Sequence, residues 1–231
     1  MPSGDQLISC SRDKTIRVWE TATGYCVKTL TGHAEWVRDV AVSPCGALIA
    51  SCSQDQSVRL WNWESGACTQ ILDGHEHVVE SVAFSNASAD ATIVACAAAA
   101  AKAAGVPPLP GTADAESADG LGGGYVVSAS RDKTVRVWSV ATGECVSTLR
   151  GHDNWVLRAL FHPGGQFIVS ASEDRSLRVW DMTQSGRCRT TLENAHGHFV
   201  SSLAIHRGGA LFASGGVDKL VKVWRGRKLR T

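Results

Sequence analysis

Hydrophobic and polar residues alternate along short stretches of this chain. Ile16 and Val18 flank Arg17, and the same pattern recurs over residues 135–137. A period of two places apolar side chains on one face of a β-strand and polar side chains on the other. Glycine-containing segments such as residues 163–165 and 207–209 have the composition of turns between such strands. The pattern therefore predicts short antiparallel strands over most of the chain.

One nine-residue segment occurs five times along the chain. Its copies end at Trp19, Trp61, Trp138, Trp180 and Trp224, and these tryptophans follow one another at intervals of 42, 77, 42 and 44 residues. A period of this size is typical of a protein built from one repeated unit of secondary structure. The longer interval indicates an insertion of 35 residues in the third unit.

Polar residues recur with the tryptophans at fixed spacings. Every copy has an Asp six residues before the Trp and a Ser four residues before that Asp, and three copies have a His 28 residues before the Trp. His75 has the same role at a distance of 63 residues, and the spacing selects His196 rather than His198. We interpret these residues as a structural hydrogen-bond network, made of His33, Ser51, Asp55, Trp61, His75, Ser128, Asp132, Trp138, His152, Ser170, Asp174, Trp180, His196, Ser214, Asp218 and Trp224.

The repeated unit resembles the WD repeat, in which a Gly-His pair opens the unit and a tryptophan strand closes it. The resemblance implies an all-β fold, a partial WD-repeat β-propeller of about four and a half blades, each a four-stranded antiparallel sheet. One long loop rich in Ala, Gly and Pro interrupts it. The expected units of this propeller segment, residues 1–231, are 1–31 (partial), 32–73, 74–150 with the inserted loop 86–124, 151–194 and 195–231.

The inserted loop and the chain ends carry further expectations. Thr92 to Ala104 is rich enough in alanine for a short helix but shows no amphipathic face that could dock, and we expect disorder after Gly105. The chain begins with residues 6–9 as a second strand and stops seven residues after Trp224. The first blade then lacks its innermost strand and the last its outermost, as in a fragment of a larger propeller.

Composition narrows the classes of partner. Lys and Arg number 23 against 22 Asp and Glu, a net charge of +1, which gives no general reason to expect binding to nucleic acid or a membrane surface. No apolar run approaches the ~20 residues of a membrane span, and the first residues lack a signal peptide, so we expect a cytoplasmic protein. The eight cysteines form no C-x-x-C pair, and we expect packed thiols in the outer strands at Cys26, Cys68, Cys145 and Cys188 and small-residue core sites at Cys10 and Cys52.

Two kinds of chemistry can be weighed against the structural interpretation. Ser, His and Asp could form a catalytic triad, but a triad occurs once per active site, whereas this set recurs with a Trp in four units. His75 with His77, and His196 with His198, could offer imidazoles to zinc, but no third cluster of ligands accompanies them. We therefore expect no catalytic residue, no metal and no cofactor.

Positions at which the repeats differ are the candidates for function. The residue before the repeat Asp, and those three and five residues after the repeat His, differ from unit to unit, and in WD-repeat proteins these sites line the top face around the channel. They would form a cationic and aromatic patch of Arg12, Trp36, Arg38, Arg131 and Trp155. The alternative is that the tryptophans pack neighbouring blades and the arginines form surface ion pairs.

The amino-acid sequences of the repeated units are similar to those of one family in particular. Residues 11–30, 32–38, 74–79, 151–156 and 195–200 resemble the lissencephaly-1 family, known in fungi as nuclear distribution protein nudF. The resemblance implies a non-enzymatic scaffold that regulates cytoplasmic dynein in nuclear migration and spindle positioning. It also implies nudE-type partners and a location in the cytoplasm, at microtubule plus ends and the spindle pole. The family's arginines and tryptophan for the motor domain correspond to Arg12, Arg38, Arg131 and Trp155, and Arg175 stands at a further basic position.

The chain also departs from that family. The family has a seven-bladed propeller and self-associates through an N-terminal helical region that this sequence does not contain, and Leu157 stands where an arginine is expected, with Arg158 one step along. Two alternatives stay open. One is a generic WD-repeat adaptor, such as a substrate receptor of a ubiquitin ligase, and the other is a regulatory subunit of an acetylhydrolase.

Overall fold

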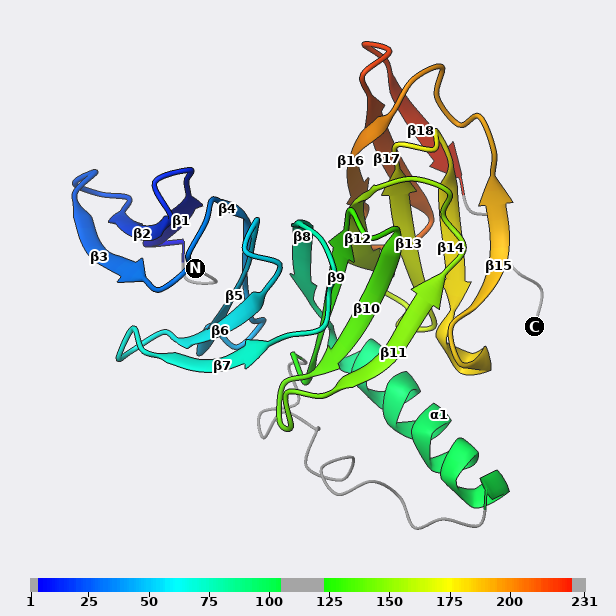
Figure 1. Ribbon diagram of the computed structural model, residues 1–231, viewed down its shortest axis with the longest axis horizontal. Helices are drawn as coiled ribbons and strands as arrows, with labels where there is room; N and C mark the ends of the chain where they lie inside the picture. The colour runs from blue at the N-terminus through cyan, green and yellow to red at the C-terminus, as the bar shows by residue number, and fades with distance from the viewer. Residues whose placement is uncertain (1–3, 105–122, 226–231) are drawn as a thin grey trace.

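The protein is a succession of five separate antiparallel sheets (Figure 1), described by a computed structural model over residues 4–104 and 123–225. The first sheet has β1 (Gln6–Cys10), β2 (Thr15–Glu20) and β3 (Cys26–Thr31). The second has β4 (Val37–Val42), β5 (Leu48–Ser53), β6 (Val58–Asn62) and β7 (Cys68–Leu72), and the third has β8 (Val79–Phe84), β9 (Tyr125–Ser130), β10 (Thr134–Ser139) and β11 (Cys145–Arg150). The fourth has β12 (Val156–Phe161), β13 (Phe167–Ser172), β14 (Leu177–Asp181) and β15 (Arg187–Leu192), and the fifth has β16 (Val200–Ile205), β17 (Leu211–Gly216) and β18 (Val221–Arg225).

The sheets follow one another along an open arc. Strands pair in chain order within each sheet, and the first strands of neighbouring sheets, β4 with β8, β8 with β12 and β12 with β16, lie in contact. Figure 1 shows this succession from the blue β1–β3 sheet to the orange and red β16–β18 sheet. The expected all-β partial propeller is confirmed, and its blades are these sheets.

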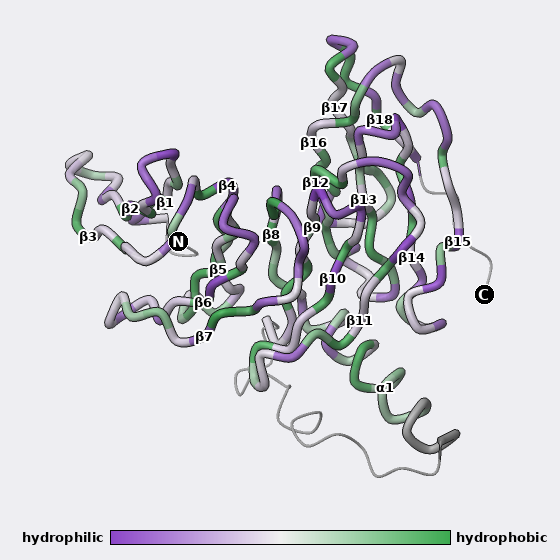
Figure 2. Tube along the Cα trace, in the orientation of Figure 1, coloured by the Kyte–Doolittle hydropathy of each residue, from purple (hydrophilic) through white to green (hydrophobic). Residues whose placement is uncertain are grey.

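The second, third and fourth sheets each bury a tryptophan against the sheet before it. Trp61 packs with Ile16 and Leu30 of the first sheet, and Trp180 packs with Val135 and Leu149 of the third. Alternation makes this packing possible, because apolar and polar residues follow one another along the strands, as the changes between green and purple in Figure 2 show. Full burial of a large apolar side chain stabilises the fold by about 1.5–3 kcal/mol. The core is therefore divided among the joints between sheets.

The first strand of each of the last four sheets has a β-bulge near its start, at the position five residues after the repeat His. In β4 the pairing with β5 shifts between Val37 and Asp39, and the same shift occurs in β8, β12 and β16. The extra residue at the bulge is Arg38 in β4 and Glu80 in β8. A bulge leaves its extra residue outside the ladder and turns its side chain. These divergent positions thus occupy one geometric site in successive sheets.

The insertion differs from the expected loop. It begins with an 18-residue helix, α1 (Ala87–Ala104), which starts before Thr92 and lies beneath the third and fourth sheets in Figure 1. Contrary to the expectation of no docking face, Ala89 and Ile93 are buried in the core beside Phe161. The sequence of α1 shows no clear amphipathic pattern because the buried contact is made by only two residues one turn apart, one of which is an alanine.

Polar contacts fix the start of this helix. The Asn86 side chain accepts a hydrogen bond from the backbone N–H of Ala89 at 2.9 Å and so caps the first turn. Buried Asp90 accepts hydrogen bonds from the Ser85 hydroxyl and from the backbone N–H of Gly124, at 3.1 Å for the latter. These bonds tie α1 to both ends of the interrupted hairpin. The disorder expected after Gly105 concerns residues that lie outside the described ones.

The cysteine expectation is wrong for most positions. Cys26, Cys68 and Cys145 are exposed at the start of the outermost strands, and of the cysteines in the described residues only Cys52 is fully buried. The outermost strand of a sheet is paired on one side only and its other edge faces solvent. A residue that recurs in this strand therefore need not be buried. No helix among the described residues combines the length and apolar character needed to cross a membrane.

Candidate protein-binding face

Four of the five sheets contain the same buried chain of side chains. In the fourth sheet, Trp180 Nε1 lies 2.8 Å from Ser170 Oγ, which lies 2.7 Å from His152 Nε2, and His152 Nδ1 lies 2.7 Å from Asp174 Oδ2. The second, third and fifth sheets repeat these contacts around His33, His75 and His196. His196, and not His198, is the imidazole in the fifth sheet.

The donors and acceptors of this chain determine the histidine tautomer. An indole N–H can only donate, so Ser170 Oγ accepts from Trp180 and its own hydroxyl proton goes to His152 Nε2. The proton of the neutral imidazole is then on Nδ1 and is donated to Asp174. Every polar side-chain atom of this four-residue network has a partner, and Ser170 is fully buried. Ser170 is therefore enclosed within the network and not exposed on the surface, unlike the nucleophile of an accessible catalytic triad.

The network shifts the pKa values of its carboxylates. Burial alone raises the pKa of Asp174, but the hydrogen bonds from His152, from the Ser176 hydroxyl and from the Ser176 backbone hold the pKa well below its usual value. The pKa values of Asp55 and Asp132 are lowered by the same balance of effects. Burial is the main cause of a lowered pKa at His75, which favours the neutral imidazole. The folded state thus holds these groups as carboxylate and neutral imidazole.

The predicted patch residues lie at the joints between consecutive sheets. Arg12, in the turn between β1 and β2, places its guanidinium carbon 4.4 Å from the ring centroid of Trp36, which precedes β4. Arg131, in the turn between β9 and β10, lies 4.1 Å from the ring centroid of Trp155, which precedes β12. Such a cation–π contact contributes about 0.5–1 kcal/mol at a partly exposed site. Each pair joins the turn of one sheet to the loop that enters the next.

Glu80 links the patch residues of two sheets. Its carboxylate accepts from Arg38 Nε at 2.9 Å and Nη2 at 2.7 Å, and from Arg131 Nε at 2.6 Å. The Glu80 side chain is only 9% exposed, whereas those of Arg38 and Arg131 are 25% and 24% exposed. The structure thus brings Arg38, Arg131 and Trp155 into one contact network. Glu80 is one of the divergent positions five residues after the repeat His, but its pairing with the arginines is not predicted from the sequence. The signal in the sequence was an acid at the position where the preceding sheet has Arg38.

Two predicted positions stand apart from this network. Arg175 is exposed in the turn between β13 and β14, at the edge of an open groove between the fourth and fifth sheets. Arg158 forms an ion pair with Asp39 of the second sheet, and that carboxylate also accepts from the backbone N–H of Val82. Leu157 takes the bulge position that Arg38 and Glu80 occupy in their sheets. Arg158 therefore does not replace the arginine missing at Leu157.

Metal binding has no support in the described part of the chain. No group of three or more His, Cys, Asp or Glu side chains is placed there to hold an ion. His75 and His196 are occupied by their Ser and Asp partners. His77 Nδ1 and His198 Nδ1 accept the backbone N–H groups of Val78 and Phe199. The two histidine pairs thus make separate local contacts.

Comparison with known families decides the class of repeat. The model described as WD domain, G-beta repeat, matches residues 1–20, 24–62, 121–139, 143–181 and 186–225. The chain belongs to the WD-repeat family. The Trp–Ser–His–Asp chains of His33, His152 and His196 each lie within one matched segment, whereas each arginine–tryptophan pair joins two matched segments.

Three curated relatives of this WD-repeat chain have the same name. Nuclear distribution protein PAC1 of Fusarium vanettenii is 45% identical over 201 residues, covering 87% of this chain and 42% of the relative. The proteins of the same name from Gibberella zeae and Coccidioides posadasii are 42% and 41% identical over 201 residues, and 41% and 40% of their lengths are covered. The resemblance to the nuclear distribution protein family is confirmed, and the chain spans about two fifths of the length of these relatives.

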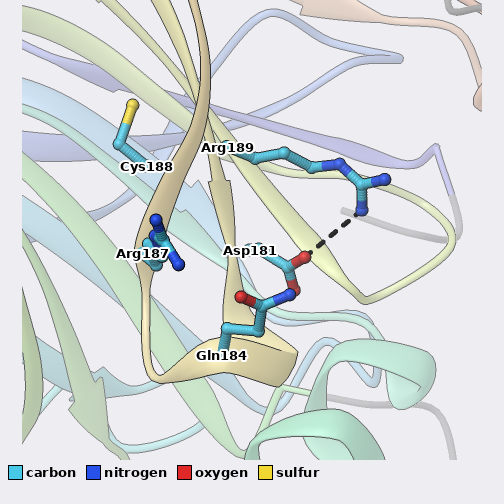
Figure 3. Close-up of a pocket in the computed structure, with 5 residues that line it drawn as sticks. All are labelled: Asp181, Gln184, Arg187, Cys188 and Arg189. Carbon is cyan, nitrogen blue, oxygen red and sulfur yellow. Dashed lines mark hydrogen bonds and ion pairs between the residues drawn. The ribbon is translucent and has the colours of Figure 1, made fainter.

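A small hollow at the other end of the fourth WD repeat offers no comparable site. It is lined by Asp181, Gln184, Arg187, Cys188 and Arg189. Figure 3 shows Arg189 turned toward Asp181, with Nη1 and Oδ2 3.3 Å apart, and Cys188 on the other side of the strand. Arg189 also lies over the Phe167 ring at 5.3 Å. Because Asp181 is already paired with Arg189 within the same repeat, we place the candidate site on the face of the arginine–tryptophan pairs.

Proposed function

We propose that this chain is a non-enzymatic protein-interaction scaffold that regulates cytoplasmic dynein in microtubule-based nuclear migration and spindle positioning. The observation that carries the proposal is the contact network of Arg38, Glu80, Arg131 and Trp155, next to the Arg12–Trp36 pair, on one face of the arc. The network and the pair together contain three arginines and one glutamate. Arginine and tryptophan are enriched among the residues that dominate binding energy at protein interfaces.

The partner follows from the resemblance and not from the geometry alone. The relatives are named nuclear distribution proteins, and the lissencephaly-1 family that the sequence resembles regulates dynein. We therefore propose the dynein motor domain as the partner of this face, with Arg175 at its margin, and nudE-type proteins as further partners. The proposed location is the cytoplasm, at microtubule plus ends and spindle poles.

Preorganisation supports a binding role for these side chains. Arg131 is held from two sides, by Glu80 and by the ring of Trp155, and keeps part of its guanidinium exposed. A side chain that is already ordered loses less entropy when a partner binds. The same contacts also stabilise the joint between sheets, so the surface-pair and binding interpretations are compatible.

A pull-down of purified dynein motor domain with this chain tests the proposal. The variant Arg131→Ala with Trp155→Ala is compared with Arg189→Ala, which removes an arginine that is likewise paired with a carboxylate and placed over a ring, at the opposite end of a repeat. Circular dichroism first establishes that all three proteins fold. We expect the double variant to lose binding and Arg189→Ala to keep it.

Two results would count against the proposal. A folded chain that never retains the motor domain would leave the generic adaptor or the acetylhydrolase regulatory subunit. Equal binding by the double variant and by Arg189→Ala would move the motor-binding surface away from this face.

A further inference from the structure

The joint between the fourth and fifth sheets carries an acid where the first and third joints carry an arginine. At the first and third joints the turn residue is an arginine, Arg12 or Arg131, placed over a tryptophan ring. At the fourth joint the equivalent turn residue is Glu173, and the equivalent ring is that of Phe199. The ring is therefore retained, but the cation that lies over its counterparts is replaced by an acid.

An open groove lies at this joint. Its lining includes Asp153 and Glu173 of the fourth sheet, Arg175 at the rim, and His198 and Phe199 of the loop that enters the fifth sheet. The Phe199 ring contacts the ring of His198, with centroids 4.2 Å apart, and the Phe199 backbone N–H donates to His198 Nδ1 at 2.9 Å. The groove therefore presents an aromatic ring together with carboxylates.

The carboxylates of the groove are not equally available. Asp174 is occupied by His152 and by the Ser176 hydroxyl at 2.6 Å. The Glu173 carboxylate accepts no hydrogen bond from the part of the chain that the structure describes, although Arg131 acts on it electrostatically. Burial raises the pKa of Glu173, and Arg131 opposes this shift. A half-buried carboxylate without a hydrogen-bond donor is stabilised by a cation that approaches from outside.

We propose that this acidic joint, made of Asp153, Glu173, His198 and Phe199, receives an arginine side chain of a partner protein. The guanidinium would lie over the Phe199 ring, as Arg12 and Arg131 lie over theirs, and would pair with Glu173. A planar guanidinium can stack on a ring and bind a carboxylate at once, whereas an ammonium group acts as a point charge. The inference rests on the proposed function only in taking this face to bind a protein. It adds that the partner surface carries a basic residue here and acidic residues opposite Arg12, Arg38 and Arg131.

The test uses the peptide acetyl-Gly-Arg-Gly-amide as a probe and the NMR signals of the Phe199 ring in the full chain as the readout. A peptide with citrulline in place of arginine keeps the shape of the side chain and removes the charge. We expect the arginine peptide to shift the ring signals in a saturable way and the citrulline peptide to bind about tenfold more weakly.

Two variants and one control make the test specific. Glu173→Gln removes the charge, and we expect a roughly fivefold weaker affinity for the arginine peptide. Glu173→Arg supplies the cation from within, as at the first and third joints, and should abolish the saturable shift. The control Glu64→Gln makes the same change of net charge at an exposed site in another sheet and should bind like the unaltered chain.

Equal binding of the arginine and citrulline peptides would overturn the inference. So would equal affinities of Glu173→Gln and Glu64→Gln, since binding would then not depend on the groove carboxylate. The titration contains no dynein, so its failure is separate from a failure of the pull-down. Binding of the peptide without binding of dynein would support the acidic joint and reject the proposed partner.

Discussion

The guanidinium of Arg131 lies 4.1 Å from the ring centroid of Trp155, and the two residues belong to consecutive sheets. The contact joins the proposed binding face to the packing between repeats. Repeat proteins take their stability from such neighbour interfaces. A substitution at this joint therefore acts on stability and on binding, and the two effects have to be measured separately.

Replacing Arg131 with alanine should lower the free energy of unfolding by about 1 kcal/mol, because the change removes both the cation over Trp155 and one arginine from Glu80. Urea denaturation measures the difference. Gln54→Ala, at the equivalent turn position of the second sheet, is the matched control and should stay within about 0.5 kcal/mol of the unaltered chain. A control that destabilises as much as Arg131→Ala would show that the turn, and not the stacked pair, is responsible.

Replacing Ser170 with alanine should destabilise the protein by about 2–4 kcal/mol. The change leaves two buried groups, Trp180 Nε1 and His152 Nε2, without partners at once. The control is Ser9→Ala, where an exposed serine bonds to Trp19 Nε1 at 2.8 Å and no histidine among the described residues takes part. That change should cost less than about 1 kcal/mol. Equal losses in the two variants would contradict the role assigned to the histidine.

Stability should fall as the solution becomes acidic. The pKa values of Asp55, Asp132 and Asp174 are below their usual 3.8 in the folded state, so the unfolded chain takes up protons first. The stabilisation from these carboxylates is complete above pH 3.8 and is lost as the pH falls toward the folded pKa. The lowered pKa of His75 acts in the same direction, from pH 6.5 downward.

Urea denaturation at a series of pH values between 7 and 3 checks this dependence. The variant Asp132→Asn should be less stable at pH 7 and should show a shallower loss below pH 4, because one of the shifted groups is gone. A free energy of unfolding that stays constant over this range would contradict the assigned protonation states.

The docking of α1 predicts a difference between two glycines of nearly equal backbone conformation. Gly165 has φ +76° and Gly24 has φ +72°, so alanine is strained at both by about 1 kcal/mol. At Gly165 a Cβ atom would also overlap the Ser88 backbone at the start of α1, whereas at Gly24 it would meet no atom within 4 Å. Gly165→Ala should therefore be the more destabilising by about 2 kcal/mol in thermal or urea unfolding. Equal losses would mean that α1 does not rest on this turn in solution.

Sequence alone determined the repeated elements of this protein. The strict spacing of Ser, Asp and Trp, with the alternation of apolar residues, predicted the strands and the choice of His196 over His198, and the resemblance of the unit to the WD repeat implied the partial propeller. These features are local or periodic, so each copy of the repeat supports the assignment of the others. The patch positions Arg12, Trp36, Arg38, Arg131 and Trp155 also emerged from the repeats, as the places where they differ.

Tertiary structure decided what depends on neighbours distant in the sequence. Val135 is fully buried, but Val221 at the same repeat position is 78% exposed, because no further sheet covers the last one among the described residues. The docking of Ile93 on the fourth sheet and the link from Glu80 to two arginines likewise join residues from different repeats. Periodicity states which face of a strand is apolar, whereas burial and charge pairing depend on the segment that packs against it.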